Sequence, residues 1–173
     1  MLMRLICGLI YPTKGEIVID GKRLGKEITF PQSVGLLLEN PAFLDSYTGF
    51  ENLEMLASIK NIITREEIHE AITSVGLDPL DKRKYKKFSL GMKQRLGIAA
   101  AIMEKPDILI LDEPTNSLDS SGVSLVKTIL AKERERGAII ILACHDLRIL
   151  QDVSDEIFLL EQGKITEHLY KPF

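Results

Sequence analysis

Two adjacent carboxylates, Asp112 and Glu113, offer the clearest chemistry in this sequence. They follow a continuous apolar run at residues 108–111, which has the composition of a buried parallel strand. Open α/β sheets bind their ligands at the carboxyl ends of such strands. Asp112 could hold Mg²⁺ through a water, because this hard cation takes oxygen ligands and keeps much of its hydration. Glu113 could orient or deprotonate an attacking water. Ordinary solvated acids at a strand end are the alternative.

The residues around these acids form linked motifs. The string Leu-Asp-Glu-Pro-Thr-Asn-Ser-Leu-Asp, residues 111–119, resembles the Walker B segment and D-loop of the ATP-binding-cassette (ABC) ATPases. Residues 88–95 resemble the signature motif of that family, and residues 39–41 lie where it has its Q-loop. His145, which follows a second apolar run, matches the switch histidine. Four motifs in the family's order leave little room for chance agreement.

The resemblance implies a role for each matched residue. The predicted catalytic residues are Glu113, as the base, and His145, as a contact of the γ-phosphate. Ser89 and Gly91 would lie at a helix N-terminus, where free N–H groups and the helix dipole favour a phosphate bound to the opposite subunit. A helix that Ser89 merely caps is the alternative there, as an ordinary strand-end histidine is for His145. The implied ATP-binding residues are Asp112, Ser89, Gly91, Glu39 and Asp119, and the implied metal ligands are Asp112 and Glu39.

Some matched positions depart from the family pattern. Leu90 replaces a glycine and Met92 a glutamine in the signature motif, so the polar contact from position 92 is lost while the phosphate contact of Ser89 can still form. Glu39 stands where the family usually has a glutamine, and it would place an extra negative charge beside Mg²⁺. Asp119 is expected to organise a dimer interface rather than to take part in the chemistry.

The elements that must position these residues follow from hydrophobic patterns and turn signals. Continuous apolar strands that alternate with helices predict a parallel sheet covered on both faces. Residues 1–10 are apolar on all sides and predict a buried helix or the remnant of one. The expected strands are residues 16–20, 33–38, 108–111, 138–143 and 156–160, and the helices between the later strands are residues 123–136 and 146–153.

The middle of the chain is predicted to be helical. Thr48 with Glu51, and Thr64 with Glu67, have the spacing of capping boxes. Ser89 would cap a third helix that continues through Met103. We therefore expect one partial ABC ATPase domain over residues 1–173, with a P-loop NTPase-like α/β core. Residues 1–41 and 106–173 would form this core, and residues 42–105 an inserted helical subdomain.

Composition limits the class of protein. The chain has 173 residues, of which 45% are hydrophobic and 27% charged, as in an ordinary single domain. Its net charge of −3 argues against a protein that coats nucleic acid, so no nucleic-acid partner is expected and the basic stretch at residues 82–87 is interpreted as a solvated loop. Cys7 and Cys144 lie in apolar settings typical of a reducing compartment. A cytoplasmic location, peripheral at the inner face of the cell membrane, is expected.

One motif of nucleotide hydrolysis does not occur in the sequence. No glycine begins a G-x-x-x-x-G-K-[ST] string, whose N–H groups cradle phosphates and whose Lys and hydroxyl serve phosphate and Mg²⁺. Residues 1–10 resemble the helix that follows this loop in a complete cassette. We therefore expect a cassette without its P-loop and first strands, with exposed apolar edges such as residues 16–20.

These observations favour the ATP-binding, ATP-hydrolysing subunit of an ABC transporter. ATP and Mg²⁺ would be its cofactors, and a membrane permease and a second cassette its partners. A non-catalytic cassette that offers only Ser89 and Gly91 to a partner's nucleotide is the alternative. A third interpretation, a soluble cassette of translation or DNA repair, would usually need a second cassette or long inserts. The apolar segment at residues 41–47 is expected to dock the permease through Phe43, and burial of Phe43 under the helices is the alternative.

Overall fold

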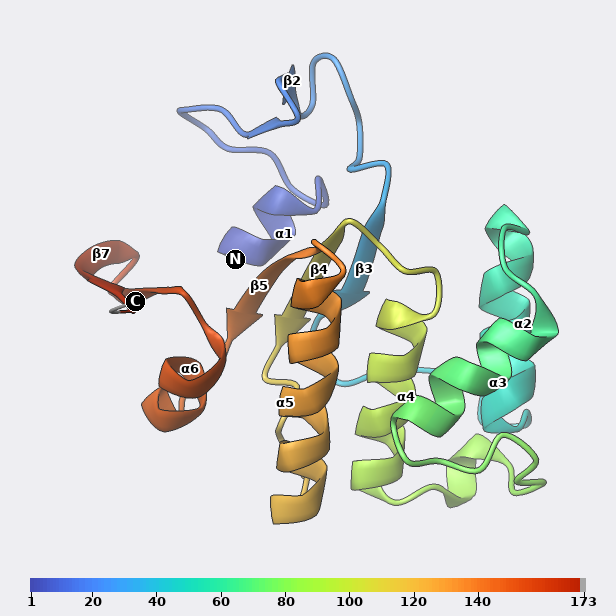
Figure 1. Cartoon of the computed structure of the whole chain (residues 1–173). Coiled ribbons are helices and arrows are strands. Elements are labelled where there is room, and N and C mark those ends of the chain that lie inside the picture. Colours follow the sequence, from blue (N-terminus) through green and yellow to red (C-terminus); the bar gives the residue numbers. More distant parts are fainter. Residues whose placement is uncertain (172–173) are drawn as a thin grey trace.

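Three parallel strands form the centre of the fold. They are β3 (Val34–Leu37), β4 (Ile108–Asp112) and β5 (Ile139–Ala143), and they lie in the order β3-β4-β5 (Figure 1). The structure is a computed structural model that describes residues 1–171. The register pairs Leu37 with Leu111, and Asp112 with Ala143. The carboxyl ends of the strands therefore meet at one edge of the sheet, and the predicted parallel sheet is confirmed.

Strand β4 is buried because both faces of the sheet are covered at its position. Leu109, Ile110 and Leu111 are each 0% exposed. On one face lie α4 (Leu90–Ile102) and α5 (Ser120–Glu135), whose apolar side chains join the main core (Figure 1). On the other face, Ile108 and Ile110 pack with Cys7 and with half-buried side chains such as Met3 and Ile6.

The expectation of a buried helix over residues 1–10 is wrong in extent. Helix α1 is only Leu2–Ile6, and none of its residues is buried. Cys7, directly after it, is 2% exposed and contributes to the core of that face. Met1, Leu2 and Leu9 are exposed because α1 covers the sheet with one side only.

Two glycines allow α4 to cross closely over β3. A Cβ atom on Gly35 of β3 would lie 1.9 Å from the carbonyl oxygen of Ala101, and one on Gly97 of α4 would lie 2.8 Å from the Leu37 side chain. Neither position could hold a larger residue without a shift of backbone or core. This close packing places the N-terminal half of α4 beside the segment that leaves β4.

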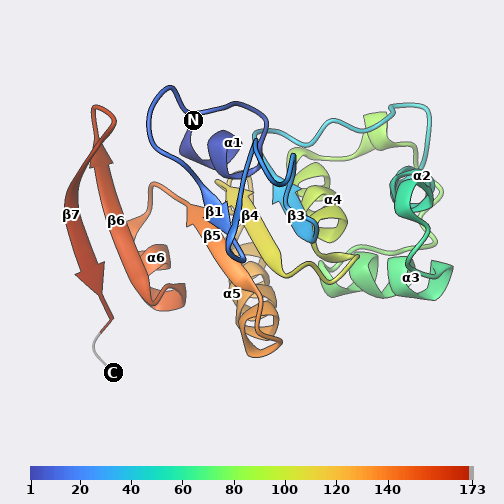
Figure 2. The same ribbon diagram turned by 90° about the horizontal axis from the view of Figure 1, so that it is seen from above.

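The predicted helices of the middle segment are confirmed, caps included. Helix α2 is Gly49–Lys60 and α3 is Arg65–Ser74, and both begin with complete capping boxes. The Glu51 N–H donates to Thr48 Oγ1 over 3.1 Å, and the Thr48 N–H donates to the Glu51 carboxylate over 2.6 Å. Between α3 and α4 lies a short 3₁₀ turn, Tyr85–Lys87. These helices stand beside the sheet rather than over its centre (Figure 2).

Two antiparallel hairpins complete the described chain. Strands β1 (Val18–Ile19) and β2 (Lys22–Arg23) pair around Asp20 and Gly21, and β6 (Glu156–Glu161) pairs with β7 (Lys164–Tyr170). Within residues 1–171, β6 pairs only with β7, so the expectation that residues 156–160 extend the parallel sheet is wrong. Helix α6 (Leu147–Val153) connects β5 to this hairpin (Figure 2). The exposed apolar character expected for residues 16–20 is confirmed at Val18, which is 52% exposed.

None of the helices within residues 1–171 combines the length and the apolar composition that a membrane-spanning helix needs.

Candidate functional site

Glu113 and His145 meet where β4 and β5 end. The Nδ1 atom of His145 lies 2.8 Å from Glu113 Oε2, a distance at which an Nδ1–H donates to the carboxylate. The side chain of Glu113 is 30% exposed and that of His145 is 75% exposed, so a small molecule can reach both. The structure thus brings together the two residues that the sequence nominated as catalytic.

The backbone of Glu113 is held in a conformation that non-glycine residues rarely adopt. Its φ is +48°, in the left-handed region, which costs about 1–2 kcal/mol for an L-residue. Its N–H donates to the Ala143 carbonyl over 2.9 Å. Its own carbonyl accepts a hydrogen bond from Gln94 Nε2 over 3.0 Å. These contacts from β5 and α4 hold the residue in place.

Gln94 is a positioning residue that sequence reasoning missed. It lies inside the signature-like segment, is only 6% exposed, and uses its amide to connect α4 to the end of β4. Gln94 stands between Lys93 and Arg95, so local polarity gave no signal of its burial. Its partner could not be predicted, since that partner is a main-chain oxygen 19 positions away.

Asp112 and Glu39 lie at the same edge of the sheet. Asp112 is half-buried at the last position of β4. Glu39 follows β3, has φ +62°, and forms an ion pair with Arg4 of α1. Arg4 was not among the predicted site residues. Its guanidinium balances the negative charge of the Glu39 carboxylate.

The residues present fit a magnesium ion only in part. Among residues 1–171, no three His, Cys, Asp or Glu side chains gather into a set that could hold a metal ion. Mg²⁺ in phosphate-transfer sites is usually bound by one or two carboxylates, with waters and phosphate oxygens as the other ligands. Asp112 can serve as such a carboxylate, while the carboxylate of Glu39 is in contact with Arg4.

Ser89, Gly91 and Asp119 share a second location. They line an open groove between the start of α4 and the segment before α5, together with Gly76, Leu77, Leu90, Met92, Arg95, Ser117 and Leu118. Ser89 Oγ accepts the Met92 N–H over 3.2 Å, which confirms the predicted cap. A Cβ atom on Gly91 would lie 3.0 Å from the Ser117 carbonyl oxygen, so glycine suits this close approach.

Asp119 has a structural task of its own. Its carboxylate accepts the Gly122 N–H over 2.8 Å and caps α5, which therefore begins at Ser120 and not at residue 123 as expected. The Gly122 N–H, then the Ser121 hydroxyl, and also nearby Arg95, lower the pKa of Asp119. A capping carboxylate that stays ionised keeps the D-loop-like segment next to Gly91.

The predicted site residues therefore form two groups. Glu113 and His145 lie at the strand ends with Asp112 and Glu39, and none of these four lines the groove of Ser89, Gly91 and Asp119. Gln94, one helical turn beyond Gly91, provides the described connection between the two groups.

Phe43 is half-buried, which favours the alternative in which it packs under the helices. Its ring packs against the core, edge-on to Tyr85 with ring centroids 5.4 Å apart. Leu44 and Tyr47 of the same segment are exposed. Tyr85 itself is 3% exposed, so its ring cannot stack on bases, in keeping with a loop interpretation of residues 82–87.

Comparisons with known proteins agree with these motifs. The model of the ABC transporter family matches residues 1–116. Over 165 residues the chain is 48% identical to the uncharacterized ABC transporter ATP-binding protein YybJ of Bacillus subtilis (strain 168), covering 95% of this chain and 76% of that protein. Over 169 residues it is 37% identical to the bacitracin transport ATP-binding protein BcrA of Enterococcus faecalis, covering 96% of this chain and 55% of that protein. The chain thus spans little more than half the length of some curated relatives.

Solved structures show the same fold. The dimeric structure of MJ0796, a bacterial ABC transporter cassette, superposes with a TM-score of 0.87 at 21% identity, over 99% of this chain and 80% of that chain. An ATP-binding subunit of an ABC transporter superposes with a TM-score of 0.84 at 26% identity, over 98% of this chain and 72% of that chain.

Proposed function

The chain belongs to the ABC transporter family, and from that premise we propose that it is the ATP-binding, ATP-hydrolysing subunit of a transporter with a separate permease. ABC ATP-binding proteins are generally ATPases. The contact between Glu113 and His145, 2.8 Å long at the strand ends, is the observation that carries the proposal. The protein would reach the cytoplasmic face of the membrane by binding the permease.

In this proposal Glu113 is the general base. Its carboxylate accepts a proton from a water whose oxygen attacks the γ-phosphorus of ATP, and the bond from that phosphorus to the bridging oxygen of ADP breaks. His145 holds the Glu113 carboxylate through Nδ1–H. Only in its doubly protonated form would it also donate Nε2–H to a phosphate oxygen. Mg²⁺, held through Asp112, would supply positive charge to the phosphates.

The groove of Ser89, Gly91 and Asp119 supports a second cassette as partner. This groove contains none of the catalytic candidates, so it suits a nucleotide held mainly by another subunit. The N–H groups at the start of α4 would then face that nucleotide's phosphates. Asp119 would keep the adjoining segment in place at the dimer interface.

A second candidate function rests on the sequence itself. The 173 residues include the groove of Ser89 and Gly91 but no G-x-x-x-x-G-K-[ST] string. A cassette of this kind could act as a non-catalytic partner that only completes another subunit's nucleotide site. We expect the 173-residue chain alone to bind ATP weakly and to hydrolyse it at background rate.

A Mg²⁺-dependent ATPase assay tests both candidates. The assay uses the 173-residue chain and the same chain joined to a P-loop-containing segment of an ABC cassette. In the joined protein, Glu113→Gln should lower turnover by about 100-fold or more while ATP binding is kept. Glu161→Gln, an exposed acid on β6, is the matched control and should keep full turnover.

The outcomes separate the candidates. Unchanged turnover in Glu113→Gln would assign the base elsewhere. Turnover by the 173-residue chain alone that Glu113→Gln abolishes would show that a P-loop is not needed. If the joined protein is inactive but the chain stimulates ATP hydrolysis by a second cassette, and Gly91→Val abolishes that stimulation, the non-catalytic function holds.

A further inference from the structure

Three carboxylates gather where β3 and β4 end. Asp112 is the last residue of β4 and Glu113 follows it. Glu39 lies two positions beyond the end of β3, whose last residue, Leu37, pairs with Leu111. Adjacent strands lie about 4.8 Å apart, so the three acids share one short stretch of the sheet edge. Negative charges this close attract a divalent cation, and they also repel the phosphates of a nucleotide.

The three carboxylates differ in what they contact. Glu113 Oε2 lies 2.8 Å from His145 Nδ1. The Glu39 carboxylate forms an ion pair with the Arg4 guanidinium. In the part of the chain that the structure describes, Asp112 forms no ion pair. A cation that binds Asp112 therefore breaks no ion pair, whereas a cation that binds Glu39 must displace Arg4.

The two partners of the Arg4–Glu39 pair are anchored in one apolar cluster. The cluster between α1 and β4 includes Met3, the residue before Arg4, and Leu38, the residue before Glu39. The φ angle of Glu39 is +62°, so the chain leaves the direction of β3 at this residue. Packing of the neighbouring side chains thus holds the guanidinium and the carboxylate next to each other.

Asp112 is directed to the face of the sheet that α1 covers. Side chains alternate between the two faces of a strand, and Ile110 packs in the cluster that includes Met3 of α1. Asp112, two positions after Ile110, lies on the same face. Because Arg4 belongs to the helix on this face, its guanidinium and a cation at Asp112 would compete for the Glu39 carboxylate.

We propose that Arg4 is a positioning residue that keeps the Glu39 carboxylate from the metal, so that the strand-end site takes up a divalent cation through Asp112 as its only protein carboxylate. The inference rests on the proposed function, in which Mg²⁺ accompanies ATP. Mg²⁺ in phosphate-transfer sites is usually bound by one or two carboxylates, with waters and phosphate oxygens as the other ligands. When Arg4 withholds Glu39, the metal keeps one more position for a water or a phosphate oxygen.

Metal binding by the 173-residue chain without nucleotide tests the proposal. The probe is Mn²⁺, which electron paramagnetic resonance detects and which takes the same oxygen ligands as Mg²⁺. Arg4→Gln releases the Glu39 carboxylate and should tighten Mn²⁺ binding about tenfold, because a second charged ligand becomes available. Arg4→Lys keeps a cation beside Glu39 and should bind Mn²⁺ as the wild-type chain does.

The water ligands of the bound Mn²⁺ distinguish direct coordination from a change of charge alone. Electron–nuclear double resonance in ¹⁷O-enriched water should show fewer water ligands in Arg4→Gln, since a Glu39 oxygen replaces one of them. Adding Glu39→Gln to Arg4→Gln should restore the wild-type affinity and number of waters. Glu39→Gln by itself should leave that number unchanged, and Asp112→Asn should weaken binding in every background.

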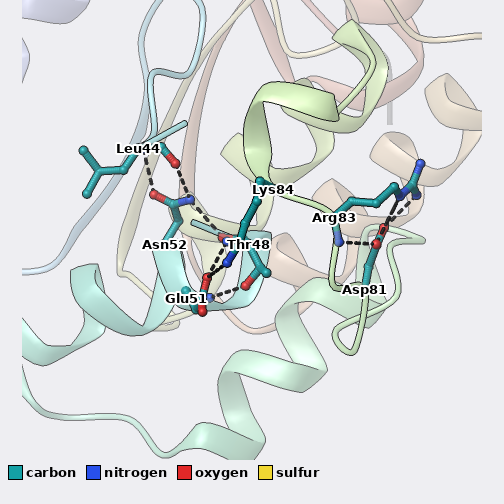
Figure 3. Close-up of polar contacts among 7 residues, drawn as sticks. All are labelled: Leu44, Thr48, Glu51, Asn52, Asp81, Arg83 and Lys84. Carbon is teal, nitrogen blue, oxygen red and sulfur yellow. Dashed lines mark hydrogen bonds and ion pairs between the residues drawn. The ribbon is translucent and has the colours of Figure 1, made fainter. Parts of the chain in front are cut away.

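Arg83→Gln is the matched control for the release of a carboxylate. It removes the arginine of another ion pair, between Arg83 and Asp81 over 2.6 Å in the helical segment (Figure 3). Mn²⁺ affinity should stay as in the wild-type chain, because the released carboxylate belongs to another part of the fold. Urea unfolding of each variant verifies folding, and the Arg4 side chain is 50% exposed, so its replacement leaves no gap in the core.

Several outcomes would overturn the role of Arg4. They are equal Mn²⁺ affinity of Arg4→Gln and the wild-type chain, binding by neither, an unchanged number of water ligands in Arg4→Gln, and a gain in affinity that persists when Glu39→Gln is added. More water ligands in Glu39→Gln alone would show that Glu39 already binds the metal in the wild-type chain. No step uses ATP, so failure here is distinct from failure of the ATPase assay.

Discussion

Backbone groups at the ends of elements find their hydrogen-bond partners in different ways in two regions of the molecule. One region is the helices of residues 42–105, and the other is the carboxyl ends of β3, β4 and β5. At the helix starts, a hydroxyl three residues earlier accepts the free N–H group, as Thr48 does for the Glu51 N–H and Ser89 for the Met92 N–H. At the strand ends the partners come from far along the chain, as Gln94 does for Glu113. There Glu39 and Glu113 also have positive φ angles.

This difference shows where the fold can support chemistry. In the helical segment the non-glycine residues with positive φ, Asn61 and Lys105, lie after helix ends, and the segment forms most of one continuous core. Strained residues held by distant partners are typical of functional sites, where side chains must be aimed rather than merely buried. The candidate catalytic pair lies in the second kind of region.

The largest effect is expected where the two regions join. Gly35→Val would place side-chain atoms where the Ala101 carbonyl already stands, 1.9 Å from the position of a Cβ atom. Overpacking of this kind costs about 3 kcal/mol or more when backbone must move. Urea unfolding should show the loss. Gly137→Asn is the control, because nothing lies within 4 Å of a Cβ there and Asn tolerates its positive φ; equal losses in both variants would refute the close-packing argument.

A smaller loss is expected inside the helical region. Asn52→Ala removes three hydrogen bonds and takes from the Leu44 N–H its Asn52 acceptor, while the Leu44 carbonyl keeps the Tyr47 N–H. Such a change costs about 2 kcal/mol. It should also speed amide exchange at Leu44 without affecting exchange in β4. Ser58→Ala, at an exposed hydroxyl of the same helix, should change stability by less than about 0.5 kcal/mol; an Asn52→Ala protein as stable as this control would show that the segment is held by other contacts.

The strand ends should respond in the opposite direction. Glu113→Asn replaces a residue strained at φ +48° by one that tolerates the left-handed region, and should raise stability by about 1 kcal/mol while removing catalysis. Glu66→Asn on α3 should lower stability slightly, since helices prefer Glu to Asn. Thermal unfolding compares the two. A destabilised Glu113→Asn protein would mean that the position carries no relievable strain.

The smallest effect concerns acid sensitivity of the helix caps. The Thr48 N–H, with Lys84, lowers the pKa of Glu51, and the Thr64 N–H, with Lys105, lowers the pKa of Glu67. Because both folded-state pKa values lie below the unfolded value of 4.5, this stabilisation is present above pH 4.5 and is lost as pH falls through the folded values. Glu51→Gln and Glu67→Gln should therefore flatten the fall in melting temperature between pH 6 and 3. An unchanged slope would assign acid sensitivity to the strand-end carboxylates instead.

The sequence by itself predicted the helix caps and the central strand, and it nominated the candidate site residues. Thr48, Thr64 and Ser89 cap the helices where their spacing predicted, and the apolar run before Asp112 is the buried central strand. Caps and hydrophobic periods depend on residues within about four positions, so a sequence displays them directly. The family motifs are equally local strings.

Tertiary structure alone decided which of these residues meet. The contacts Glu113–His145, Gln94–Glu113 and Arg4–Glu39 join positions 19 to 35 apart. The partial burial of Phe43, the shortness of α1 and the pairing of β6 with β7 were likewise decided outside their own segments. In each case the outcome depends on what surface or backbone a distant segment presents, and no local period or cap encodes it.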